Sequence, residues 1–582
     1  MDFAEDVGVF CLDGSRSWQH RPGMRKQMIL IGVLATCAVA VADEEKANDK
    51  VPGVAAVISE QLAGLPAPAE PLVGKGVVMA VTTADPKAQE DVLRGLACVH
   101  GGWDYEGYRH FCEALKKDPD CLMAHVGVLL ALLQSDLELA EEKEAALDRL
   151  LALVDQGVGS DLEQRYAFGL VKLLRDGPGE ATSAFTQMAQ DYPNDPQAVL
   201  FKSLLGRSGY DETGDATPDQ ERAENELRAV VEKNPDVPYL IYGLLAIRAE
   251  APDLSDDLPL ARKLVELAPD FPPYQHLLGH FEWRCGNHTL ASAAFGKAAD
   301  QYAKWMELTG IPVTGCPGWT KAECYRAVAL ASKGEYETAL AVAEGVARIE
   351  VTAEDAGREG GRILLWEGKT LAVRILMRRS NKGDLERALK LLPTAEDAQI
   401  YGKKSLVVWS YQAYASVLAG RASVASGRLD DARAVSNDIS ELGGRFVQTR
   451  DLAAAAGERS PWLRSFKAME VMATELRGLI SMAGPKKDIG SAYNWYRAAA
   501  DRQKLASLMM PPAVLLPMEV RLGEYYTARE DWAKSIEILT ESQTRWPNDW
   551  ELLHFLQTVF EKAGMKNDAA DVEKRIKELV AE

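Results

Sequence analysis

The stretch PYQHLLGHFEWRCGNHTLASAAF, from Pro273 to Phe295, contains the residue spacing that decides the fold. Starting at Gly279, four further marker residues follow at steps of seven, five, four and three: Gly286, Ala291, Phe295 and Ala298. Small residues at the first glycine and at the alanine let two helices approach closely, and the aromatic side chain fills the gap beside them. The stretch therefore predicts two antiparallel helices joined by a tight turn.

The same spacing recurs in distant parts of the chain. It is found at Gly95, Gly102, Gly107, Phe111, Ala114 and Pro119; at Gly169, Ala181, Phe185 and Pro193; and at Gly523, Leu539 and Pro547. The prolines are placed to end the second helix of a pair. Such pairs cannot bury their faces alone, so neighbouring pairs stack. The sequence predicts an all-α fold, an α-solenoid of antiparallel helix pairs over residues 89–582, broken by polar or glycine-rich inserts such as residues 441–461.

This pattern resembles the tetratricopeptide repeat, a helix pair of about 34 residues. The first repeat is similar to that of a bacterial subfamily, through Asp118, Pro119, Asp120, Cys121, Met123 and Ala124, and the H-x-x-x-H-x-x-x-R-x-G pattern of that subfamily matches His276, His280, Arg284 and Gly286. At His125 the chain departs from the subfamily, where Trp or Tyr is common. The resemblance implies a superhelix whose concave surface holds peptide partners.

Composition limits the classes of partner. The chain has 582 residues, of which 47% are hydrophobic and 26% charged, and its formal net charge is −20. This describes a chain able to bury a large core, whose electrostatic field repels polyanions. We therefore expect a protein or peptide partner and no nucleic acid.

The N-terminal 42 residues have the features of a signal for export. After residues 1–23, a positive start at Met24 precedes an apolar run, and Ala40-Val41-Ala42 forms a cleavage site. The run is shorter than the roughly 20 residues needed to span a bilayer, so no span is expected in the mature chain. Lipid attachment at Cys37 is the alternative. We expect an exported protein, periplasmic or extracellular, with a Pro/Ala-rich lead-in at residues 43–88 that is extended or partly disordered.

Six cysteines remain after the predicted cleavage site. An exported protein can oxidise them, and local bridges Cys98–Cys112 and Cys316–Cys324 are possible. Their sparse, uneven spacing argues against a disulfide framework.

The histidine-containing helix supplies the candidate site. His276, His280, Trp283 and Arg284 share one stripe, which we expect to line the concave groove and to contact a partner. Large aromatic and arginine side chains suit such a surface. Two alternatives stay open: the histidines, at i and i+4, could hold a metal ion if a third ligand joins them, or they could simply pack against a covering insert and hydrogen-bond its backbone.

The predicted function is a non-catalytic scaffold of the cell envelope that binds a protein or peptide, with no cofactor. No catalytic residue set can be assigned from the sequence. The alternatives are a metal-binding or metal-dependent protein using His276 and His280, and a structural spacer subunit of an envelope assembly.

Overall fold

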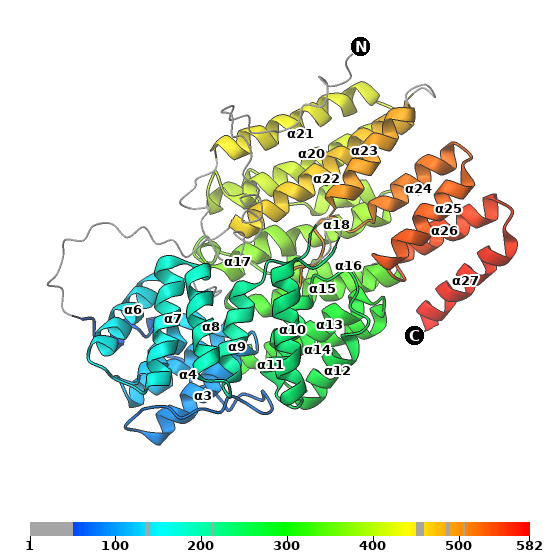
Figure 1. Ribbon diagram of the computed structural model, residues 1–582. Coiled ribbons are helices and arrows are strands. Elements are labelled where there is room, and N and C mark those ends of the chain that lie inside the picture. The colour runs from blue at the N-terminus through cyan, green and yellow to red at the C-terminus, as the bar shows by residue number, and fades with distance from the viewer. Residues whose placement is uncertain are drawn as a thin grey trace, which may run out of the picture.

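The computed structural model describes residues 51–133, 139–211, 214–449, 459–484, 489–503 and 507–581. The predicted signal segment and Cys37 lie outside the described residues. Within them, no helix combines the length and the apolar character needed to cross a bilayer. The described part of the chain is an α-solenoid of antiparallel helix pairs, and its sole β-type pairing is the isolated bridge between Tyr210 and Ala216 (Figure 1).

The N-terminal half of the array packs around one continuous apolar core that extends from Val57 to Phe281. Its helices are α3 (Pro86–His100), α4 (Asp104–Lys117), α5 (Leu122–Ala131), α6 (Ala140–Asp155), α7 (Asp161–Asp176), α8 (Pro178–Asp191), α9 (Pro196–Gly206), α10 (Pro218–Lys233), α11 (Pro238–Arg248), α12 (Leu258–Leu267) and α13 (Pro272–Arg284). The next helix, α14 (His288–Thr309), contributes Ala291 and Phe295 to the C-terminal core.

The C-terminal half has a second core, from Trp283 to Ala569, so the two cores meet at α13. Its helices are α15 (Pro317–Lys333), α16 (Tyr336–Ala347), α17 (Glu359–Ile363), the π-helical turn η5 (Leu364–Gly368), α18 (Lys369–Arg379), α19 (Asp384–Leu391), α20 (Leu406–Ala425), α21 (Leu429–Thr449), α22 (Arg459–Ala483), α23 (Ile489–Arg502), α24 (Met518–Ala528), α25 (Trp532–Glu541), α26 (Trp550–Lys562) and α27 (Lys566–Ala581).

The marker residues of the sequence pattern meet as predicted. A Cβ placed on Gly279 would lie 2.8 Å from the ring of Phe295, and one on Gly95 would lie 2.5 Å from Phe111. The ring of Phe111 also faces Gly127 of the next helix pair, at 2.2 Å from the position of a Cβ. The glycine in each case gives room for an aromatic ring between helices, which any side chain would obstruct.

One expected insert differs from the sequence prediction. Residues 441–449 were assigned to a glycine-rich insert, but they form the last turns of α21. A Cβ on Gly443 would come within 2.9 Å of the Met469 side chain on α22. The glycine here permits close helix packing, and that packing outweighs its weak intrinsic helix preference.

From residue 51 on, the lead-in contains two short helices, η2 (Val54–Ala56) and α2 (Glu60–Ala63), is otherwise without helix as far as Asp85, and packs on the array. Ser59 donates its backbone N–H to the Tyr108 hydroxyl at 3.0 Å, and Thr82 donates its N–H to Glu163 at 2.8 Å. Val73, Val77 and Val81 are buried in the N-terminal core. The first long helix begins at Pro86, three residues before the start of the array that we predicted.

The C-terminal helix pairs turn back onto the middle of the array, where α26 packs against α15 (Figure 1). Asn548 donates to the carbonyl oxygen of Gly286 at 3.1 Å. Arg378 pairs with Asp549 at 2.8 Å, and the indole of Trp550 covers Gly334. These contacts join residues that are roughly 170 to 260 positions apart. Residues 507–517, just before α24, pack against α13, α15 and α18.

Candidate functional site

The four residues predicted to line a groove lie on α13 and are no more than 7% exposed. Each of the four side chains forms hydrogen bonds with other parts of the chain. His280 Nε2 lies 2.9 Å from the carbonyl oxygen of Ala249, and Arg284 donates to the same oxygen at 3.0 Å. Trp283 donates its indole N–H to Ser332 at 3.1 Å. These three side chains therefore bind α13 to neighbouring helices and to the loop after α11.

His276 reaches a different target, the loop between α23 and α24. Its Nε2 lies 2.9 Å from the carbonyl oxygen of Leu508. Since a carbonyl oxygen only accepts, this nitrogen carries the hydrogen. Burial lowers the pKa of His276 to about 4 and that of His280 to about 3, so both rings are neutral at pH 7. The arrangement matches the alternative in which a covering segment is hydrogen-bonded through its backbone.

The two histidines do not share a metal-binding geometry. Their Nε2 atoms are directed at the carbonyl oxygens of Leu508 and Ala249, which belong to separate loops. In the described part of the chain, no group of three or more His, Cys, Asp or Glu side chains is arranged to hold an ion. The residues present at this position do not fit a metal centre, because a stable zinc site needs at least three protein ligands.

The cysteine pairs are also unbridged. The six described cysteines, Cys98, Cys112, Cys121, Cys285, Cys316 and Cys324, are thiols. Burial raises the pKa of Cys112 to about 12 and that of Cys98 well above its usual value. A thiol in such apolar surroundings is inert at neutral pH, because the reactive form is the thiolate.

The segment that His276 contacts runs from Ser507 to Pro517, and we call it the inner segment. It is an irregular loop with six bends in its eleven residues, and its carbonyl oxygens accept from side chains of several helices. Arg464 of α22 donates to Pro511 at 2.7 Å, Arg378 of α18 donates to Leu515 at 2.7 Å, and Arg374 of α18 donates to Pro512 at 3.3 Å. Helices far apart in the sequence thus hold one bent loop through its main chain.

Tyr325 on α15 completes this set of donors. Its hydroxyl lies 2.9 Å from the carbonyl oxygen of Met510 and is also in contact with that of Ser507. A phenol has one hydroxyl hydrogen, so it bonds one of these oxygens at a time. We call the five side chains that bind the inner segment the inner face: His276, Tyr325, Arg374, Arg378 and Arg464.

Buried carboxylates hold the arginines of the inner face in position. Glu367, in the π-helical turn, pairs with Arg374 and, at 2.8 Å, with Arg464. Asp549 pairs with Arg378. Each guanidinium therefore keeps a charged partner while its other N–H groups point at the inner segment, which offsets much of the cost of burying it.

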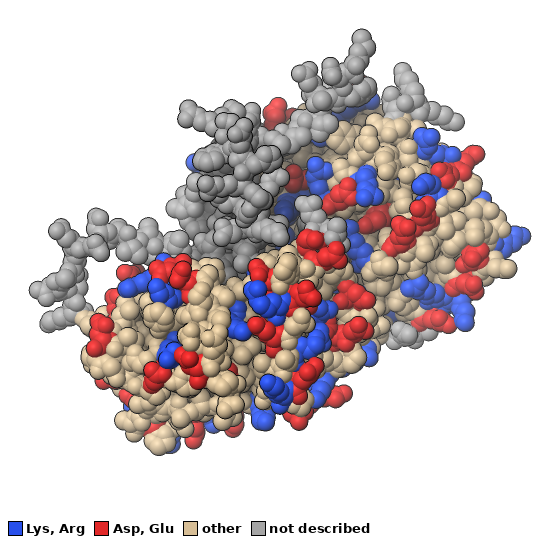
Figure 2. Space-filling model, viewed as in Figure 1, with Lys and Arg blue, Asp and Glu red and all other residues tan. Residues whose placement is uncertain are grey.

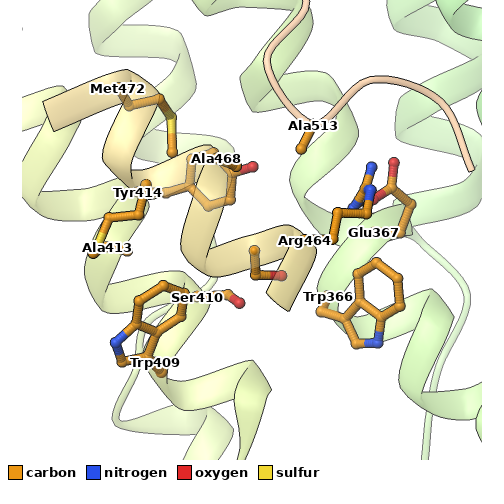
Figure 3. A pocket seen from close by; sticks show the side chains of 12 residues that line it. Trp366, Glu367, Trp409, Ser410, Ala413, Tyr414, Arg464, Ala468, Met472 and Ala513 are labelled. Atoms are coloured by element: carbon orange, nitrogen blue, oxygen red, sulfur yellow. Dashed lines mark hydrogen bonds and ion pairs between the residues drawn. The ribbon is translucent and has the colours of Figure 1, made fainter. Parts of the chain in front are cut away.

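Two pockets flank the inner segment. The first is a small cavity of about 10 Å³, bounded by Trp366, Trp409, Tyr414 and Met472, with Ala513 of the inner segment at its edge and the Glu367–Arg464 pair beside it (Figure 3). The second lies beside Val514, Leu515 and Leu516 and is bounded by Arg374, Arg378 and Arg421.

Sequence reasoning found His276 but missed the rest of the inner face. Arg374 and Arg378 repeat the i, i+4 spacing of the two histidines on a helix of the same kind, which was a usable signal. The inner segment, SLMMPPAVLLP, lacks a charged residue in a chain that is 26% charged. Its prolines rule out a helix, so an uncharged run there indicates a covered loop.

Charges on the outer surface are mixed. On the face shown in Figure 2, Lys and Arg alternate with Asp and Glu over the visible helices, with no patch of one sign. The positive groups that do gather are the buried arginines of the inner face.

No protein-family model and no curated protein sequence matches the chain. Among solved structures it is similar to a human IFIT1 dimer with PPP-AAAA, at 15% identity and a TM-score of 0.31, over 79% of this chain and 91% of that one. It is also similar to a human IFIT1 dimer with m7Gppp-AAAA, at 14% identity and a TM-score of 0.33, over 79% and 90%. The TPR domain of P58(IPK) matches at 11% identity and a TM-score of 0.18, over 70% and 99%. The helix pairs and their glycine–aromatic contacts make the described part of this chain an all-α helical-repeat solenoid.

Proposed function

We propose that the protein is a non-catalytic scaffold of the cell envelope that binds a segment of another protein at its inner face. One observation carries the proposal: five side chains from four helices donate to the backbone carbonyl oxygens of a single loop, Ser507–Pro517. Main-chain hydrogen bonds of this kind supply affinity for extended peptides, and adjoining pockets supply selectivity.

The same chemistry supports a binding role over an enzymatic one. The polar side chains of the inner face are arginines, a tyrosine and a neutral histidine, all engaged with carbonyl oxygens or buried carboxylates. Their geometry stabilises a polypeptide backbone and leaves no nucleophile beside a base. Location in the envelope, with periplasmic or extracellular exposure, is supported by the signal-like segment from Met24 to Ala42.

Photocrosslinking in intact cells tests this function. A benzophenone amino acid replaces Met509, which is 42% exposed on the inner segment, and in a matched control it replaces Leu308, which is 67% exposed on α14. The Met509 probe is expected to capture a discrete protein that fractionates with the envelope, and the Leu308 probe is expected not to.

Each of the other outcomes has a definite meaning. Capture from Leu308 alone would reject the inner face as the binding surface and favour the structural-spacer alternative. No capture from Met509, with the probe incorporated and helix content retained, would contradict the scaffold function.

A further inference from the structure

The C-terminal arm, which we define as α24–α27, contacts repeats that are not its neighbours in the stack. Residues 546–551 make these contacts: Asn548 donates to the carbonyl oxygen of Gly286 at 3.1 Å, and the indole of Trp550 covers Gly334. In a solenoid each helix pair is stabilised by the pairs stacked beside it, and the arm has such a neighbour because α24 packs against α23. The contact between the arm and the middle of the array, which we call the closure, is therefore additional to the stack.

Charged and polar groups form the centre of the closure. Asp549 of the arm pairs with Arg378 of α18 at 2.8 Å, and Arg378 donates to the hydroxyl of Tyr336 at 3.2 Å. That hydroxyl in turn donates to Glu551 of the arm. Separation of the two sides admits water to these groups. Opening therefore leaves no charge both buried and unpaired, which is the costly situation inside a protein.

His288, the first residue of α14, lies inside the closure and is 4% exposed. Within the described part of the chain, neither ring nitrogen has a hydrogen-bond partner of normal geometry, although the backbone at Pro547 and Asn548 is near enough to interact weakly with the ring. Buried polar side chains nearly always have a partner, so an unpartnered ring at a contact between distant repeats is unusual.

The surroundings of this ring disfavour a positive charge. Burial is the largest cause and lowers the pKa of His288 to about 4; Asp549 and the nearby backbone oppose the shift, and Arg378 adds to it. The N-terminus of α14 also disfavours a cation. The other charged groups of the closure are Glu551 and Arg575, whose guanidinium donates to the side chain of Asn548 at 2.8 Å. The closed state thus holds the neutral imidazole.

We infer that the closure is an acid-released clasp: when His288 takes up a proton, the arm detaches from the middle of the array while its own helix pairs stay folded. Opening uncovers the indole rings of Trp546 and Trp550, which lie against Trp283 and Gly334 in the closed state. The clasp is independent of what the inner face binds.

The direction of the pH effect follows from where the proton binds first. An open state with an ordinary histidine pKa near 6.5 is protonated before the closed state, so closure is favoured above pH 6.5 and weakens as the pH falls toward 4. Between pH 7.5 and 5.5, His288 is expected to raise the ratio of open to closed molecules about tenfold. Burial raises the pKa of Glu551, whose protonation favours the closed state and opposes this change. Comparison with a variant that lacks only the histidine isolates its contribution.

Single-molecule energy transfer in the full chain tests the clasp. Dyes are attached to an azide-bearing amino acid at Lys574 of α27 and at Lys390 of α19, whose side chains are 77% and 72% exposed. A second pair, at Lys390 and at Asp430 of α21, reports on the array alone. Acidification from pH 7.5 to 5.5 is expected to increase the low-transfer population of the first pair and to leave the second pair unchanged.

Two leucine variants separate His288 from the other buried histidines. In His288→Leu the low-transfer population is expected to rise about tenfold less than in the wild type over the same pH range. His110→Leu is the matched control. His110 of α4 is likewise buried, and within the described residues neither of its nitrogens has a partner of normal hydrogen-bond geometry, with Asp91 at 3.8 Å. This variant is expected to open as the wild type does.

Constant transfer from the first dye pair, with helix content retained at pH 5.5, would overturn the inference. An equal response of the wild type and His288→Leu, or loss of the response in His110→Leu, would overturn it as well, because the proton would then act elsewhere. A parallel fall in the second dye pair would show unfolding in place of opening. If His288→Leu loses helix content, His288→Gln takes its place with the same criteria.

Discussion

At the scale of single residues, contacts between glycine and aromatic rings set the distance between helices. Gly279 on α13 leaves the space that the ring of Phe295 on α14 fills, and a Cβ would meet that ring at 2.8 Å. By contrast, a Cβ on Gly345 of α16 would meet only the end of the Arg348 side chain, at 3.9 Å. Both glycines are helical, so they differ in packing alone.

Gly279→Ala is therefore expected to lower the free energy of unfolding by about 1–3 kcal/mol, because the added methyl group overpacks the helix contact. Gly345→Ala is expected to raise it by about 0.5–1 kcal/mol through higher helix propensity. Urea denaturation followed by circular dichroism measures both. Equal effects from the two substitutions would show that the close contact at Gly279 does not limit packing.

At the scale of elements, the position of α26 depends on one buried carboxylate. Asp549 pairs with Arg378 of α18 and also caps α26 by accepting from the backbone N–H of Leu552 at 3.3 Å. Arg378 in turn donates to Leu515 of the inner segment. A single side chain thus links the C-terminal helices, the middle of the array and the inner segment.

Asp549→Ala is expected to lower the free energy of unfolding by about 3–5 kcal/mol, since it leaves the Arg378 guanidinium buried without its charged partner. Asp549→Asn keeps a capping oxygen and should lose about 1 kcal/mol less. The control is Asp430→Ala, which removes an exposed ion pair with Arg433 and should leave the thermal midpoint unchanged. A loss at Asp549 no larger than that of the control would mean that α26 is positioned by its apolar contacts alone.

At the scale of the whole molecule, buried histidines make stability depend on pH. Burial lowers the pKa of His100, His125, His276 and His288 to about 4, and that of His280 to about 3. The unfolded chain, with histidine pKa values near 6.5, takes up these protons first as the pH falls. Unfolding is therefore favoured progressively below about pH 6.5.

At pH 5 each of these histidines is expected to cost about 2 kcal/mol of stability relative to pH 7.5. The losses from several histidines add up to an amount comparable with the net free energy of unfolding of a typical domain. The melting temperature should therefore fall steeply between pH 6.5 and 4. Circular dichroism melts at pH 7.5, 6 and 5 measure the effect. An unchanged melting temperature between pH 7.5 and 5 would mean that the histidines are protonated within the fold without penalty.

The repeat architecture could be predicted because it depends on local spacing. Gly279 and Phe295 are sixteen positions apart, and the helix pair that joins them forms from neighbouring residues. For the same reason the stripe on α13 was visible in the sequence. Its partners were not, because helical periodicity indicates which side chains share a face and not what covers that face.

The sequence by itself determined that this chain forms stacked antiparallel helix pairs, that glycine and aromatic residues pack them, and that His276, His280, Trp283 and Arg284 share one side of a helix. Only the tertiary structure decided that this side is covered, and by which part of the chain. His276 and Leu508 are 232 positions apart, and they meet because the curvature of many successive pairs brings the segment before α24 against α13. Small rotations at each pair accumulate along a solenoid, so its closure is a property of the whole array.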